Sequence, residues 1–169
     1  DIGLKHNHIG IEGLYSLCRT LLLPGCFIQK LGLGKNSLGD EGAKILRKVI
    51  VTSTRLIELD VSANELTCKG VKHICRGLRE NATVKFLDLS ANEFSHNGVK
   101  EIVKLLLLNK EILKIDLGHN RFGRNDCNLL KRALLFNTTV QLKNFDKYTT
   151  TDYVKLANVG LKQAQASVW

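Results

Sequence analysis

The sequence repeats itself, and two neighbouring copies decide the fold. The stretch LDVSANEL occupies residues 59–66, and LDLSANEF occupies residues 87–94, 28 residues later. Three further stretches continue the series: IGLKHNHI at 2–9, LGLGKNSL at 31–38 and IDLGHNRF at 115–122. Five copies in register indicate a protein of stacked units, because self-similarity at a fixed period is the signature of repeat architectures.

An asparagine shared by the copies fixes their register. The five residues are spaced by 29, 28, 28 and 28 positions: Asn7, Asn36, Asn64, Asn92 and Asn120. A side-chain amide at the end of a strand can hydrogen-bond the turning backbone of its own unit and of the neighbouring one. We therefore predict a structural role for these asparagines, and no catalytic one.

Each copy predicts one strand and one helix. Leu87 and Leu89 alternate with Asp88 and Ser90, which is the period of a half-buried strand. The apolar residues that follow have the i, i+3, i+4, i+7 spacing of a helix: Val71, Ile74, Cys75 and Leu78, then Val99, Ile102, Val103 and Leu106. Glycines six residues after the asparagine suit the turn into each helix: Gly13, Gly42, Gly70 and Gly98. One such unit cannot bury both apolar faces alone, so the units stack and their strands form a parallel sheet.

The pattern Leu-x-x-Leu-x-Leu-x-x-Asn-x-Leu, carried by Leu56, Leu59, Val61, Asn64 and Leu66, resembles the leucine-rich repeats. The 28-residue period and the full helix are similar to the ribonuclease-inhibitor-like class. That class includes the repeats of nucleotide-binding innate immune receptors, Ran GTPase-activating proteins and tropomodulin-type actin regulators. The resemblance implies a right-handed α/β solenoid, with a parallel sheet on the concave face and helices on the convex face.

The domain boundaries follow from the register. Residues 1–142 are predicted to form five leucine-rich repeats of 28–29 residues, and residues 143–169 a degenerate strand and a capping helix that begins at Thr151 or Asp152. Continuing the register places Lys143 and Tyr148 where Ile115 and Asn120 stand. The chain begins inside a predicted strand, so we expect a piece of a longer protein or an end that a partner completes.

Composition is that of a globular intracellular protein. Of 169 residues, 44% are hydrophobic and 24% charged, and no apolar run is long enough to span a membrane. The five cysteines form no Cys-x-x-Cys pair, which argues against a disulfide framework or a zinc module. Together with the absence of a signal-peptide pattern, this favours the reducing cytoplasm. Sequons at Asn81 and Asn137 point the other way, but such triplets are common in proteins that are never glycosylated.

The predicted binding surface lies on the concave face. Six residues flank the buried leucines there: Glu58, Asp60, Phe86, Asp88, Lys114 and Asp116. An exposed aromatic ring rimmed by carboxylates is a typical binding hot spot, so we predict a protein partner that presents basic residues. The alternative is that the ladder of three aspartates stays hydrated and that Phe86 packs over the neighbouring strand.

Catalytic, metal-binding, nucleic-acid-binding and membrane-binding sites are less favoured than a protein-binding surface. Cys68 and His96 share one loop column and are predicted to stack near one another, but no third group orients them, so we predict neither catalysis nor a cofactor. His6, His8 and His119 lack further ligands for a metal site. The net charge of +9 is spread over the helices without interleaved aromatic residues, which favours a solvated convex face over a nucleic-acid or membrane site.

The function predicted from these features is protein recognition, as an interaction module or scaffold within a larger intracellular assembly. The alternative is regulation of a small GTPase, which the resemblance to GTPase-activating proteins implies.

Overall fold

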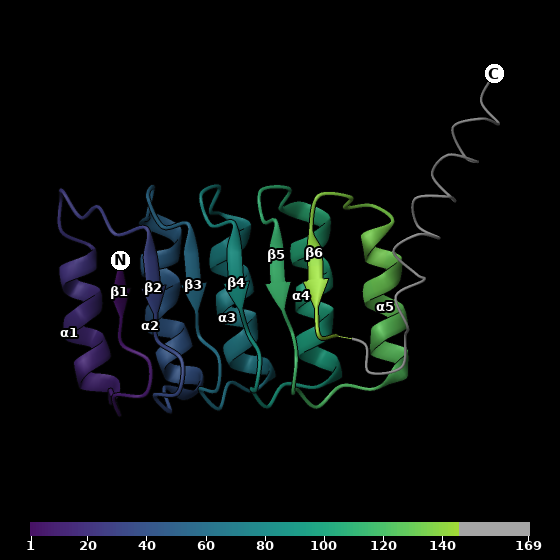
Figure 1. Cartoon of the computed structure of the whole chain (residues 1–169), viewed down its shortest axis with the longest axis horizontal. Coiled ribbons are helices and arrows are strands. Elements are labelled where there is room, and N and C mark those ends of the chain that lie inside the picture. Colours follow the sequence, from purple (N-terminus) through teal and green to yellow (C-terminus); the bar gives the residue numbers. More distant parts are fainter. Residues whose placement is uncertain (146–169) are drawn as a thin grey trace, which may run out of the picture.

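A computed structural model describes residues 1–145, which form a row of alternating strands and helices (Figure 1). The elements in chain order are β1 (Ile2–Gly3), α1 (Ile11–Leu21), β2 (Lys30–Gly32), α2 (Gly39–Thr52), β3 (Glu58–Asp60), α3 (Cys68–Arg79), β4 (Phe86–Asp88), α4 (His96–Leu108), β5 (Lys114–Asp116), α5 (Arg124–Leu134) and β6 (Gln141–Lys143). The predicted α/β solenoid is confirmed.

The strands form a parallel sheet in which each strand pairs with the next one along the chain, in the order β1 to β6. Leu59 lies opposite Leu87, and Leu87 lies opposite Ile115, so the register between β3, β4 and β5 equals the 28-residue period. The sheet makes one layer and the helices make the other (Figure 1). Equivalent residues of successive repeats therefore stand in rows across the sheet.

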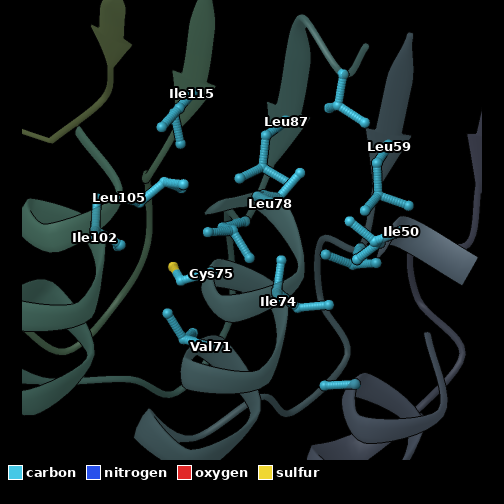
Figure 2. Packing of buried hydrophobic residues seen from close by; sticks show 14 of the residues in the cluster. Ile50, Leu59, Val71, Ile74, Cys75, Leu78, Leu87, Ile102, Leu105 and Ile115 are labelled. Atoms are coloured by element: carbon cyan, nitrogen blue, oxygen red, sulfur yellow. The ribbon is translucent and has the colours of Figure 1, made fainter. Parts of the chain in front are cut away.

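The core lies between the two layers. The strand residues Leu59, Leu87 and Ile115 point toward the helix layer, where Ile74 and Leu78 of α3 lie beneath Leu87 (Figure 2). All five side chains are at most 3% exposed. Each repeat buries its apolar faces against its own helix and its neighbours, which is why the units are stable only when stacked.

The four predicted turn glycines lie inside the helices α1 to α4, and Gly70 and Gly98 show that close packing requires them there. A Cβ atom on Gly70 would come within 2.5 Å of the Oδ1 atom of Asp40 in the previous repeat. A Cβ atom on Gly98 would come within 2.8 Å of the Cβ atom of Phe94. The glycines are therefore required for the close approach of neighbouring segments.

The sixth strand forms one residue earlier than the constant period predicts. Leu142, and not Lys143, lies opposite Ile115. The shift lets the half-buried Leu142 pack against the core while the Lys143 ammonium group stays in water. Tyr148 and the helix predicted within 151–169 lie outside the described residues.

Candidate functional site

The six predicted site residues form two adjacent rows on the concave face, which is the side of the sheet turned away from the helices. One row consists of Glu58, Phe86 and Lys114, which pair across β3, β4 and β5. The other row consists of Asp60, Asp88 and Asp116. Each row alternates along its strand with a buried apolar residue, so its side chains point out of the sheet.

Each of the three aspartates accepts a hydrogen bond from the backbone that follows its own strand. The Oδ1 atom of each accepts the N–H group two residues further on, at 2.8 Å from Ser62, 2.8 Å from Ser90 and 2.9 Å from Gly118. Such a bond closes the turn after the strand and satisfies a donor that the sheet leaves unpaired. This explains why the same residue recurs at 60, 88 and 116 although like charges in adjacent strands repel one another.

Neighbouring side chains contact the other carboxylates of this face, two of them through a lysine and one through a neutral amide. The Lys5 ammonium group lies 3.5 Å from the Oδ2 atom of Asp60, and the Asn144 amide donates to the Oδ2 atom of Asp116 over 2.8 Å. Lys30 lies 3.4 Å from Glu58. Among residues 1–145, the Oδ2 atom of Asp88 has no such hydrogen-bond or ion-pair partner. The uncompensated carboxylate oxygen is therefore in the central strand.

Phe86 stands beside this carboxylate. Its side chain belongs to the same strand and the same face as Asp88, and the residue is 39% exposed. Glu58 and Lys114 flank it on the neighbouring strands. The ring is thus partly covered by its neighbours but keeps an accessible apolar surface in the middle of the sheet.

Positive charge gathers at the C-terminal side of the same face. Lys143 lies diagonally across β6 from Lys114, and contact with the Lys114 ammonium group lowers the pKa of Lys143. Two adjacent cations favour a state in which one of them is neutral or an anion is near. The concave face therefore carries both charge signs around Phe86, and Asp88 is the aspartate of its row whose second oxygen has no partner among the described residues.

The structural role predicted for the first asparagine row is confirmed. The amide oxygens of four of these residues accept backbone N–H groups of the preceding repeat, and their amide nitrogens donate to its carbonyl groups: Asn36, Asn64, Asn92 and Asn120. Asn64 is fully buried. These bonds hold the loop that follows each strand of the candidate site.

A second asparagine row, which the sequence reasoning missed, lies at the opposite ends of the strands. Asn81, Asn109 and Asn137 donate from their amide nitrogens to two carbonyl groups each in the preceding repeat, over 2.7–3.0 Å. Their 28-residue spacing is the sequence signal for this row, although Asn81 and Asn137 also begin sequons. Because Asn81 and Asn137 are only 5% and 3% exposed, their amides are structural in the folded protein.

Cys68 and His96, which the sequence places near one another in neighbouring repeats, do not pair, because each side chain has another partner. The Cys68 sulfur accepts the backbone N–H of Ser95 over 3.4 Å, and the His96 Nδ1 atom lies 2.5 Å from the Oδ1 atom of Asp126. Burial alone would raise the pKa of Cys68, but hydrogen bonds from the Ser95 hydroxyl and nearby backbone outweigh it, and the pKa is lowered. Each residue contacts the start of the next repeat's helix, so this column joins repeats.

Two other features that would suggest a function are absent from the described part of the chain. Within residues 1–145, no group of three or more His, Cys, Asp or Glu side chains is placed to hold a metal ion. No helix in the same range is long and apolar enough to cross a membrane. A cavity of about 260 Å³ lies beside the loop after α1, between residues such as Leu22, Cys26, Val49 and Leu56, and includes none of the concave-face residues.

Comparisons with known proteins agree with the repeat architecture. The family described as Leucine Rich repeat matches residues 80–103, which run from the end of α3 into α4. The chain is also similar to NACHT, LRR and PYD domains-containing protein 3 of Mus musculus and of Homo sapiens, with 37% identity over 62 residues in each. Those residues are 37% of this chain and 6% of the relative, so the match covers a small part of these relatives' length.

Among solved structures, the chain is similar to Leiomodin-1 Actin-Binding Site 2 (ABS2). The superposition has a TM-score of 0.70 and covers 93% of this chain and 94% of the other. Sequence identity is 15%, so this likeness shows the fold alone.

Proposed function

We propose that this chain, a leucine-rich repeat solenoid of the ribonuclease-inhibitor-like class, is a protein-interaction module that binds its partner on the concave face around Phe86. The observation that carries the proposal is the pairing of an accessible aromatic ring with the uncompensated oxygen of Asp88 on one rigid strand. An aromatic side chain supplies apolar contact area, and adjacent charges supply orientation and a faster association rate.

The rigidity of the surface supports the same proposal. Phe86 and Asp88 sit on a central strand that is paired on both sides, and the buried Asn92 holds the loop that follows. Side chains fixed in this way lose little conformational entropy when a partner binds. A broad, pre-organised sheet face of mixed charge suits another protein better than a small molecule, which binds in an enclosed pocket.

The partner should present an apolar pocket for the ring, with a basic group opposite Asp88 and an acidic group opposite Lys114. This pattern refines the basic partner predicted from the sequence, because Lys5 and Lys30 already compensate Asp60 and Glu58. Binding of a basic partner is therefore expected to depend on Asp88 more than on Asp60.

We further propose that the module works inside cells as part of a larger protein or assembly. The short match to much longer relatives supports this, as do the five free cysteines, Cys18, Cys26, Cys68, Cys75 and Cys127. The similar solved structure, from leiomodin-1, is of an actin-binding site. Actin is thus one protein to include among the partners tested.

Comparative affinity capture tests the proposal. The wild-type chain, the double variant Phe86→Ala with Asp88→Asn, and the control variant Tyr15→Ala are used as baits, and captured proteins are quantified by mass spectrometry. Tyr15 is 56% exposed on α1, so its removal deletes a similar aromatic surface elsewhere. We expect proteins that wild type and Tyr15→Ala retain and the double variant loses. Identical captured sets for all three baits would contradict binding at Phe86.

A further inference from the structure

The C-terminal ends of α4 and α5 carry an unusual apolar surface. Four large side chains there are exposed, and we call them the apolar tip: Leu107 (43%), Leu108 (68%), Leu135 (53%) and Phe136 (71%). The 28-residue register places Leu107 level with Leu135 and Leu108 level with Phe136, at the end of α4 and just after α5. The C-terminal ends of both helices lie at the upper edge of Figure 1. Exposed apolar residues that gather in this way mark a contact surface more often than scattered ones do.

The tip is absent from the two central repeats. At the same register positions, α2 ends with Val51 and Thr52, and α3 ends at Arg79, which Glu80 follows. The first repeat has Leu22 and Leu23 there, and Leu23 is 61% exposed. Repeat architecture alone therefore does not require leucine or phenylalanine here, because the central repeats carry mostly polar residues on the same backbone.

The backbone beneath the tip is fixed. Asn137, directly after Phe136, donates hydrogen bonds to the carbonyl groups of Leu106 and Asn109 over 2.8 and 3.0 Å. The Lys110 ammonium group donates to the carbonyl group of Phe136 over 2.8 Å, which also places a cation at the tip. The side chains are thus presented outward from a rigid edge.

A basic band lies on the same two helices, closer to their N-terminal ends than the apolar tip. It consists of Lys100, Lys104, Lys131 and Arg132. The carboxylates of α4 and α5 offset only part of it, since the two helices carry five lysine and arginine residues and two acidic ones, Glu101 and Asp126. Each of these acids faces a neighbouring side chain, Glu101 facing Lys104 and Arg79 and Asp126 facing His96.

From this arrangement we propose that the α4–α5 edge docks on an anionic phospholipid surface, with the apolar tip in the interface and the basic band at the lipid phosphates. Apolar burial plus cationic attraction is the combination that holds proteins at such interfaces. The charge complementarity selects a negatively charged bilayer over a neutral one. A protruding apolar edge also fits a flat, deformable surface better than a protein partner, which needs a matching hollow.

This inference differs from the expectation that the positive charge is only a solvated face. The sequence shows the lysines spread along the helices, whereas the stacked register places part of them next to exposed leucines and a phenylalanine. Docking through this edge leaves the opposite layer, the concave face, free for a protein partner.

Vesicle co-sedimentation of the purified chain tests the apolar part. The probes are vesicles of pure phosphatidylcholine and vesicles containing about 30% phosphatidylserine, which resembles an anionic leaflet. We expect binding to the anionic vesicles to exceed binding to neutral ones by about tenfold or more, and to fall at high salt. The double variant Leu108→Ser with Phe136→Ser should lose about tenfold in binding, whereas Tyr15→Ser should change it less than about twofold.

A charge-matched pair of variants tests the basic part. Lys100→Gln with Arg132→Gln removes two charges from the band, and Lys48→Gln with Lys72→Gln removes two from α2 and α3. We expect the first pair to weaken vesicle binding by about fivefold or more and the second pair to weaken it less. Equal effects of the two pairs, or no binding to anionic vesicles, would overturn the proposal. So would an apolar-tip variant that only abolishes self-association in analytical ultracentrifugation, because the edge would then pair with a second copy.

Discussion

The backbone N–H of Asn64 donates to the side-chain oxygen of Asn92, one repeat later, over 3.0 Å. The same oxygen accepts the N–H of Leu66 over 3.0 Å, and the Asn92 amide nitrogen donates to the carbonyl group of Val61 over 3.1 Å. One buried side chain thus satisfies three backbone groups of the preceding repeat. Because the same set recurs along the sheet, it fixes the spacing of the strands that carry Phe86 and Asp88.

Removing this side chain should destabilise the fold strongly. Asn92→Ala leaves buried backbone donors and acceptors unpaired, so we expect the free energy of unfolding to fall by about 2–5 kcal/mol. The matched control is Asn7→Ala, since the Asn7 amide makes an exposed bond to its own loop at Lys5 and should cost less than about 1 kcal/mol. Urea denaturation measures both. Equal costs would show that the asparagine row does not hold the repeats together.

A core leucine should matter as much as the asparagine row. Leu89 is fully buried between repeats, so Leu89→Ala should lower the free energy of unfolding by about 2–5 kcal/mol. Lys100→Ala, on the exposed side of α4, should cost less than about 1 kcal/mol. Similar urea midpoints for the two variants would contradict the register.

Glu101 should make the free energy of unfolding depend on pH. Burial alone would raise its pKa, but the hydrogen bond from Lys104 and the charges of Lys104 and Arg79 outweigh it, so the folded-state pKa is below the unfolded one. Its contribution is therefore complete at neutral pH, above the unfolded-state pKa, and is lost as pH falls through the lowered folded-state pKa.

We expect Glu101→Gln to cost about 1–2 kcal/mol at pH 7 and progressively less as the solution is acidified below the unfolded-state pKa. Glu41→Gln serves as the control, because the Glu41 pair with Lys44 is exposed. Urea denaturation across this pH range gives the result. A cost for Glu101→Gln that does not change with pH would show that the carboxylate titrates normally.

Thiol labelling should separate the cysteines. Burial raises the pKa of Cys18 to about 11 and the pKa of Cys75 to about 12, whereas the pKa of Cys68 is lowered. Since the thiolate is the reactive form, iodoacetamide at mildly alkaline pH should modify Cys68 at least about tenfold faster than Cys18 or Cys75. Mass spectrometry of peptides measures the rates, with urea-unfolded protein as the reference. Comparable rates in the folded chain would contradict the burial of Cys18 and Cys75.

The strands, the helices and the first asparagine row could be predicted from the sequence because each depends on a local pattern that recurs in register. Strand β6 could not be placed by extending that register, since the choice between Leu142 and Lys143 depends on which side chain the core accepts. The hydrogen-bond partners of Cys68 and His96 could not be predicted from the sequence either. Equivalent positions in the repeats show that the two residues lie in neighbouring repeats, but not the direction in which each side chain points.

The candidate site also combines features that the sequence predicts with features that only the structure shows. The rows containing Phe86 and Asp88 follow from strand alternation, and the register confirms their placement. The contacts of Asp60 with Lys5 and of Asp116 with Asn144 depend on side-chain conformations that a sequence pattern does not contain. For that reason only the structure singles out Asp88 as the aspartate whose second oxygen has no partner among residues 1–145.

The most direct test of concave-face binding is the dissociation constant of a purified captured partner for Phe86→Ala, compared with wild type and with Tyr15→Ala, by isothermal titration calorimetry. Circular dichroism first confirms that each variant is folded. We predict that Phe86→Ala weakens binding by about 2 kcal/mol, roughly thirtyfold, and that Tyr15→Ala leaves the affinity unchanged. Unchanged affinity for Phe86→Ala, or an equal loss for both variants, would contradict binding at the concave face.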